Sequence, residues 1–157
     1  IQHMIYLYDY ARQPWKTQYW VREVMDKLYL PTPDGYCGDE DNGQTSAWYI
    51  FSSLGFYPVC PGTDQYIVGS QLVHKATINL ENGKIIVIDA AGNNKSTRYV
   101  QSLKLNKKEF SLSYLRFGDL QKGATLLFKM AEKPNVKRAT SDQDLPYSYS
   151  LTNEDKQ

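Results

Sequence analysis

Apolar residues recur at helical spacing in the first part of the chain. A helical pattern covers residues 3–11, and a second helix is predicted over "QPWKTQYWVREVMDKLYL". Pro14 stands at the first position of this second helix, where a missing backbone N–H costs nothing. Its apolar stripe has the spacing i, i+3, i+4, i+7 and consists of Val21, Val24, Met25 and Leu28. The stripe predicts a helix that packs one face against the rest of the protein.

A third helix is predicted after an interruption rich in proline and glycine, "PTPDGYCGDED". Gly55 is placed to end this helix. Its apolar residues lie nearly all round it and are Ala47, Trp48, Ile50, Phe51 and Leu54. A helix that is apolar on all sides is predicted to be buried. Helices whose connecting loops carry the polar residues fit a helical barrel or bundle.

From residue 63 onward the apolar pattern changes to a period of two. Alternating or β-branched runs follow one another as "QYIVGS", "KATINL", "KIIVIDA", "STRYVQSLKL" and "ATLLFKM". The "ENG" between the second and third runs is a signal for a tight hairpin. This half is predicted to be antiparallel β structure, part of a sandwich. The predicted fold class is therefore α+β.

The same patterns divide the chain into three regions. Residues 1–60 form a helical region that includes the acidic loop, and residues 63–134 form the antiparallel β region. Residues 135–157 are polar and lack periodicity, which predicts a mobile tail. The chain begins inside a helical pattern and without an initiator methionine, so we expect it to be the C-terminal part of a longer protein.

Composition limits the classes of partner. The chain has 18 basic and 17 acidic side chains, a net charge of +1, which gives no support for a nucleic-acid or anionic-membrane partner. No apolar run reaches the roughly 18 residues that a membrane-spanning helix needs. The 13 tyrosines and 3 tryptophans suit both ordinary cores and the flat faces on which sugars stack. Because the net charge is close to zero, any ligand is expected to be neutral.

Two cysteines, Cys37 and Cys60, lie on either side of the third predicted helix. A disulfide requires their Cα atoms to come within about 7 Å of each other. The sequence does not decide whether they do.

The main candidate for chemistry is the acidic loop "GDEDNG", which places Asp39, Glu40 and Asp41 directly before the third helix. The first interpretation is capping, in which Asp41 or Asn42 accepts hydrogen bonds from the free N–H groups of the helix. Capping needs one residue and leaves the other acidic side chains unexplained. The second interpretation is a metal site, and the third is acid–base chemistry.

The metal interpretation is weak on spacing. A calcium loop of the EF-hand type starting at Asp39 would have Gly43 at its fifth position and Ile50 at its twelfth, where oxygen ligands belong. Zinc is unsupported, because His3 and His74 are far apart and no cysteine stands at ligand spacing. An irregular site would need ligands from elsewhere.

Acid–base chemistry would use the alternation of side chains along an extended loop. Asp39 and Asp41 are two residues apart and would point to one side, while Glu40 points away. A carboxylate kept ionised at a helix N-terminus suits a general base that activates water, which is one half of an inverting glycosidase. The acid would have to lie about 6.5–9.5 Å away. His3 and Glu23 are available, but both stand on helices without a loop context.

Three stretches together resemble a known family: "YLYDYARQPWKTQ", "PTPDGYCGDEDNGQTSAWYIFSSLGFYPVCPGTDQYIVGS" and "KATINLENGK". They look like the C-terminal part of the family 92 glycoside hydrolases, calcium-dependent exo-acting α-mannosidases that cleave with inversion. The resemblance covers residues 1 to about 130. It implies the last helices of an (α/α)6 barrel followed by an antiparallel, β-sandwich-like region. It also implies that Asp39 and Asp41 orient and deprotonate the attacking water.

The resemblance carries further expectations. The general acid, a Glu, and an Asn-Glu-Pro motif belong upstream of Ile1, so the chain alone is expected to be catalytically incomplete and to need the rest of the same enzyme. Calcium is implied as cofactor, with no ligand assigned here. The implied substrate is a mannose-containing glycan, as in N-glycan degradation, and the implied location is secreted or periplasmic. The alternative is a non-catalytic carbohydrate-binding or structural module whose acidic loop caps a helix.

The sequence departs from the family at a few positions. Arg12 stands where the family has Gly, at a break between helices where a positive φ is expected. Gln71 stands where Pro is usual, and Thr45 where Met is frequent. None of these residues belongs to the acidic loop.

Overall fold

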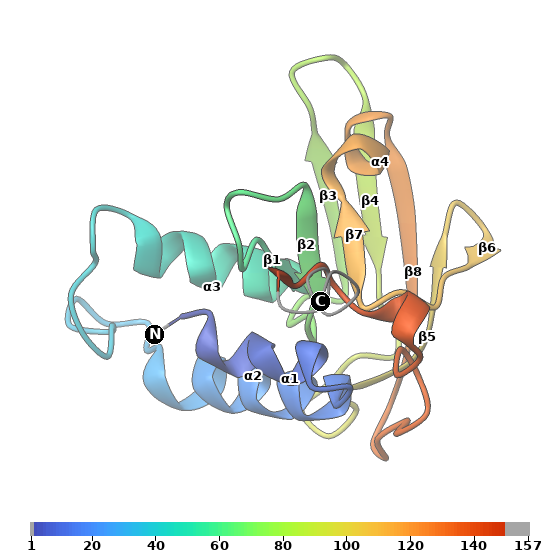
Figure 1. Ribbon diagram of the computed structural model, residues 1–157. Coiled ribbons are helices and arrows are strands. Elements are labelled where there is room, and N and C mark those ends of the chain that lie inside the picture. The colour runs from blue at the N-terminus through green and yellow to red at the C-terminus, as the bar shows by residue number, and fades with distance from the viewer. Residues whose placement is uncertain (1, 150–157) are drawn as a thin grey trace.

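The computed structural model describes residues 2–149, whose first helices lie on one side and whose two β-sheets lie on the other (Figure 1). The helical elements are η1 (Met4–Tyr6), α1 (Leu7–Tyr10), α2 (Pro14–Leu28), α3 (Gln44–Leu54), α4 (Phe117–Gln121) and η2 (Asp142–Asp144). The three predicted helices are thus present, the first of them as η1 followed by α1. Pro14 opens α2, and Gly55 ends α3 with a φ of 99°.

The strands form two sheets. Their bounds are β1 (Phe56–Tyr57), β2 (Gln65–Val68), β3 (Lys75–Asn79), β4 (Ile85–Asp89), β5 (Tyr99–Leu105), β6 (Lys108–Glu109), β7 (Tyr114–Arg116) and β8 (Ala124–Ala131). One sheet has the order β1-β2-β7, and the other has the order β3-β4-β8-β5-β6. The "ENG" segment joins β3 to β4 as the predicted hairpin, with a φ of 76° at Gly83.

The prediction of a purely antiparallel β region is wrong in one place. Strand β4 pairs with β8 in parallel, from Ile86 opposite Ala124 to Asp89 opposite Leu127. All the other strand pairs are antiparallel among the described residues. A parallel pair needs a long crossover rather than a hairpin, and here β5, β6, β7 and α4 lie between the two strands in the sequence. Local alternation in the sequence cannot reveal such a distant pairing.

The three-stranded sheet forms the middle layer of the molecule. On one face Phe56, Val68 and Leu115 join the core that the five-stranded sheet also lines. The neighbouring residues Tyr57, Ile67 and Tyr114 belong to the other core, which the helices line. Successive residues of a strand point to opposite faces, so each of these strands serves both cores. The helical and β regions are therefore joined through a shared sheet.

Helix α3 is only partly buried. Trp48 and Ser52 are buried, but Ile50 is 59% exposed and Ala47 is also exposed. The expectation of a fully buried helix is wrong for the chain as described, because the three-stranded sheet and the other helices cover only one side of it. Exposed apolar side chains on the other helices include Met4, Leu7 and Trp20.

The segment after Asn135 packs onto the domain as far as the structure describes it. Arg138, Ala139, Asp144 and Leu145 are all buried. Hydrogen bonds hold this segment, since the Asp144 backbone carbonyl accepts from the Ser113 amide at 2.9 Å. The expectation of a mobile tail is thus wrong for residues 135–149, and residues 150–157 lie outside the described part. Cys37 and Cys60 are exposed free thiols.

The helix break before α2 has the backbone that the resemblance predicts. Arg12 has a φ of 60°, in the left-handed region where glycine is favoured. The Arg12 side chain forms an ion pair with Asp142, which lies in the C-terminal segment. Among the described helices, none is long and apolar enough to cross a membrane.

Candidate functional site

A pocket of about 370 Å³ opens beside the acidic loop. Asp39 and Asp41 both line it, whereas Glu40 does not. Both aspartates are exposed. The structure therefore brings the two sequence-predicted residues together at one cavity.

The remaining walls of the pocket are mostly apolar. Val24 and Leu28 of α2 lie on one side, where they continue the predicted stripe, and Met4 lies on another. The ring of Tyr29 stacks on the ring of Trp48 with centroids 5.4 Å apart, and both residues line the pocket. Pockets with apolar walls and a few polar groups are typical of small-molecule sites.

The start of α3 shows how its free N–H groups are satisfied. The amide of Gln44 donates to the Asp41 carbonyl at 3.2 Å, and the amide of Thr45 donates to the Glu40 carbonyl at 3.1 Å. The amide of Ser46 donates to the Glu40 side-chain Oε1 at 3.0 Å. The backbone of the loop and the Glu40 side chain thus occupy these three donors.

Capping by Asp41 or Asn42 is accordingly wrong. The N-cap residue is Gly43, and it makes no side-chain capping bond. The side chain that takes the capping role is Glu40, which also accepts a hydrogen bond from the Ser46 hydroxyl. These bonds from Ser46 lower the pKa of the Glu40 carboxyl below its usual range.

Sequence reasoning missed this role of Glu40. The residue stands three positions before the N-cap, outside the positions that the usual capping patterns use. The run of three acidic residues was the available signal. If the two aspartates perform base chemistry and Asn42 caps the helix, Glu40 is left without a role.

The turn between the aspartates and α3 has a left-handed backbone. The φ values are 53° at Asp41, 57° at Asn42 and 91° at Gly43. Aspartate, asparagine and glycine are the residues that tolerate this conformation best. The "DNG" letters therefore encode the reversal that directs the chain from the pocket into α3.

The two other candidate acids stand apart from the pocket. Glu23 accepts from Arg98 at 2.6 Å and pairs with Lys27 at 2.5 Å, and these partners lower the pKa of its carboxyl. His3 is exposed at the start of η1 and is not a lining residue. Neither residue is placed to donate a proton across a sugar bound beside Asp41.

The described residues do not form a metal site on their own. Within residues 2–149 there is no group of three or more histidine, cysteine, aspartate or glutamate side chains that could hold a metal ion. Calcium takes six to eight oxygen ligands. Asp39 and Asp41 could supply two carboxylates, which does not meet that requirement. A calcium site at this pocket does not fit the ligands of this chain alone.

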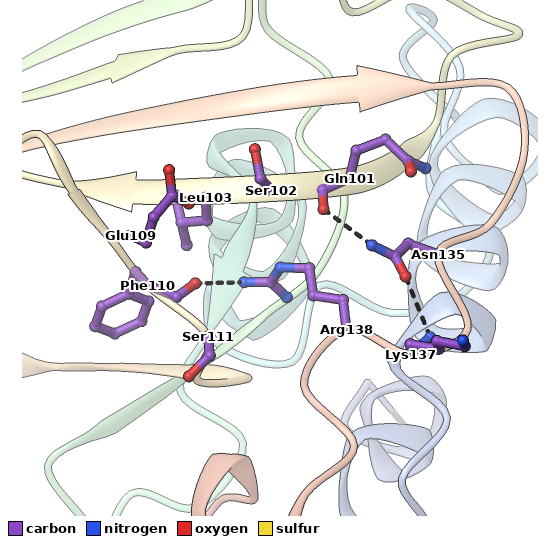
Figure 2. A pocket seen from close by; sticks show the side chains of 9 residues that line it. All are labelled: Gln101, Ser102, Leu103, Glu109, Phe110, Ser111, Asn135, Lys137 and Arg138. Carbon is purple, nitrogen blue, oxygen red and sulfur yellow. Dashed lines mark hydrogen bonds between the residues drawn. The ribbon is translucent and has the colours of Figure 1, made fainter.

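A second pocket of about 260 Å³ lies at the edge of the five-stranded sheet, between β5 and the C-terminal segment (Figure 2). Two of its polar side chains are engaged with the backbone. Asn135 donates to the Gln101 carbonyl at 3.1 Å, and Arg138 donates to the Phe110 carbonyl at 3.3 Å. These bonds join neighbouring segments, so these polar residues at the pocket are explained by their role in holding the fold together.

Solved structures resemble this chain over nearly its whole length. It is 54% identical to the family 92 inverting mannosidase BT2199 from Bacteroides thetaiotaomicron VPI-5482, with a TM-score of 0.90. It is 42% identical to the family 92 α-mannosidase BT3965 from Bacteroides thetaiotaomicron, again with a TM-score of 0.90. BT3965 in complex with mannoimidazole gives a TM-score of 0.91.

The coverage of these matches is uneven. The match to BT2199 covers 96% of this chain and 20% of BT2199, and the match to BT3965 covers 94% and 20%. The chain thus spans a fifth of the length of these structures. No curated protein matches it.

The family is shown by the sequence as well. Residues 1–132 match the catalytic domain of glycosyl hydrolase family 92. The chain belongs to this family of glycoside hydrolases, as the resemblance of its acidic loop and adjoining helices predicts.

Proposed function

We propose that this chain is the general-base segment of an inverting, exo-acting α-mannosidase that removes terminal α-linked mannose from glycans. The observation that carries the proposal is the pocket lined by both Asp39 and Asp41, next to a helix start whose amides are already engaged. Because these two carboxylates do not cap the helix, they stay available for chemistry. Family membership and the mannosidase relatives support the choice of substrate.

The mechanism is a single displacement. Asp41 removes a proton from a water molecule while that water attacks the anomeric carbon, and Asp39 holds the water in line. We assign the base to Asp41 because it is the nearer of the two to the N-terminus of α3. The general acid protonates the leaving oxygen from about 6.5–9.5 Å away. We infer that this acid belongs to the part of the enzyme outside this chain.

The same proposal includes the finer features of the architecture. Helices η1, α1, α2 and α3 would be the last helices of an (α/α)6 barrel. The exposed apolar side chains of Met4, Leu7 and Trp20 support this, since a barrel would cover such a surface with neighbouring helices. A secreted or periplasmic enzyme acting on N-glycans fits this family membership.

Calcium dependence is part of the proposal, with most ligands outside this chain. Calcium would supply polarisation of sugar hydroxyls. Adding a chelator to the full-length protein and then restoring calcium tests this point, and unchanged hydrolysis under chelation would remove calcium from the proposal.

The test of the function is hydrolysis of an aryl α-mannoside by the protein extended to the length of its relatives. We expect the extended protein to release β-mannose first, seen by NMR, and Asp41→Asn to lower kcat by orders of magnitude. Asp39→Asn should also lower kcat. Asp26→Asn, an exposed carboxylate of α2, is the matched control and should leave kcat unchanged.

Two results would contradict the proposal in different ways. A folded but inactive extended protein would favour the non-catalytic carbohydrate-binding or structural module. An active protein in which Asp41→Asn is as fast as Asp26→Asn would show that the base is another residue.

A further inference from the structure

Glu40 stands between the two pocket aspartates, yet its side chain is directed to α3. Its Oε1 accepts hydrogen bonds from both the amide and the hydroxyl of Ser46, the amide at 3.0 Å. A carboxylate that accepts bonds from a backbone N–H and a hydroxyl makes charge-assisted bonds, which are stronger than neutral ones. Glu40 therefore attaches the acidic loop to the first turn of α3.

The backbone on either side of Glu40 is tied to the same turn. The Thr45 amide donates to the Glu40 carbonyl at 3.1 Å, and the Thr45 hydroxyl donates to the Asp39 carbonyl at 2.9 Å. Thr45 itself is buried and lines the pocket. The position of Asp39 is thus fixed through Thr45, and that of the whole loop through Glu40.

The attachment also spans the left-handed turn. Asp41 and Asn42 have φ of 53° and 57°. Aspartate and asparagine adopt a positive φ more readily than other L-residues, yet it remains less favourable for them than for glycine. The bonds that Ser46 donates to Glu40 close the turn across these residues.

We propose that Glu40 is a positioning residue of the site, whose carboxylate, bound to Ser46, fixes the directions in which Asp39 and Asp41 enter the pocket. The inference rests on the proposed function for its effect on catalysis. Glu40 does not line the pocket, so it acts through its two neighbours rather than on the substrate.

The electrostatics of the bond agree with this role. The donors of Ser46 lower the pKa of Glu40, so the carboxylate is ionised at neutral pH and the attachment is intact. Protonation removes it only when the pH falls through this lowered pKa.

The kinetic experiment uses the protein extended to the length of its relatives, with an aryl α-mannoside as substrate. We expect Glu40→Ala to lower kcat at least 10-fold with little change in KM. Glu40→Gln should recover most of the loss, because its amide oxygen can accept both bonds from Ser46. The matched control is Glu81→Ala, an exposed glutamate of the β3–β4 turn, which should change neither parameter.

A double-mutant cycle with Ser46→Ala tests the coupling. If Glu40 acts through Ser46, Glu40→Ala and Ser46→Ala together should lower kcat no more than Glu40→Ala alone. Additive losses of kcat in the double mutant would overturn the positioning role. It would also be overturned if Glu40→Gln did not recover the loss of Glu40→Ala and the loss accompanied a lower Tm.

A second measurement does not depend on activity. The amides of Gln44 and Thr45, which donate to the Asp41 and Glu40 carbonyls, can be followed by NMR hydrogen exchange in the folded protein. Glu40→Ala should speed the exchange of both amides, and Glu81→Ala should speed neither. Unchanged exchange in Glu40→Ala would overturn the inference, even if an inactive parent protein had already removed the proposed function.

Discussion

The side chain of Gln18 in α2 accepts a hydrogen bond from the backbone amide of Val100 in β5, at 3.0 Å. Both residues are buried, with 2% and 1% of their surfaces exposed. The bond lies where the register of β5 against β8 shifts, between Val100 and Ser102. A backbone amide of β5 is thus satisfied by a helix 82 positions earlier in the sequence. This bond is one of the links that hold the helices on the sheets.

The first prediction follows from this bond. Gln18→Ala leaves the buried amide of Val100 without a partner, which costs about 1–3 kcal/mol of unfolding free energy. Gln44→Ala removes an exposed glutamine and should stay within about 0.5 kcal/mol of the parent. Urea unfolding followed by circular dichroism measures both. Equal stabilities for the two variants would show that Val100 finds another acceptor.

The second prediction concerns the buried carboxyl of Asp9. Burial raises its pKa to about 8, and the Thr17 hydroxyl and the charge of Arg138 oppose this shift only in part. The folded state therefore holds the proton more tightly than the unfolded state, whose pKa is 3.8. The resulting stabilisation is complete below pH 3.8 and is lost as the pH rises to about 8.

The measurement is the unfolding free energy of the parent protein and Asp9→Asn between pH 4 and 9. Asp9→Asn lacks the titration, so its stability relative to the parent should rise by about 1.4 kcal/mol per pH unit at most and level off above about pH 8. Asp26→Asn should run parallel to the parent. A constant difference between Asp9→Asn and the parent would show that Asp9 is ionised throughout.

The third prediction concerns the turn that joins the acidic loop to α3. Gly43 has a φ of 91° and open space around its Cα, so an added methyl group meets no atom but strains the backbone. Gly43→Ala should lower stability by about 1 kcal/mol. Gly38→Ala, in the same loop with open space and without a positive φ, is the matched control and should be neutral or slightly stabilising. Thermal unfolding distinguishes the two, and equal losses would rule out backbone strain as the cause.

The fourth prediction concerns Arg12, which has a positive φ where the family has glycine. Arg12→Gly should relieve this strain and raise stability by up to about 1 kcal/mol. It also removes the exposed ion pair with Asp142, but such pairs contribute little. Ala11→Gly, at a φ of −90°, has no strain to relieve and should lower stability. A loss in both variants would show that the contacts of Arg12 outweigh its backbone strain.

Much of the local structure could be predicted because it depends on neighbours in the sequence. The starts and ends of α2 and α3 follow from Pro14 and Gly55, and the β3–β4 hairpin follows from its turn residues. The parallel pairing of β4 with β8 could not be predicted, because three strands and α4 lie between these two strands in the sequence. The packing of residues 135–149 was hidden for a similar reason. The buried Arg138 donates to the carbonyls of Phe110 and Leu112, which its own neighbours in the sequence do not reveal.

For the candidate site, the residues of the acidic loop and the family could both be read from the sequence, because a long motif holds these residues at fixed spacing. The fold was needed to show that Glu40 and the loop backbone satisfy the first amides of α3, leaving the aspartates at the pocket. Several acceptors in the loop compete for few donors, so the sequence alone leaves this choice open. Which acceptor reaches which donor depends on the left-handed turn at Asp41, Asn42 and Gly43, a geometry that composition permits but does not specify.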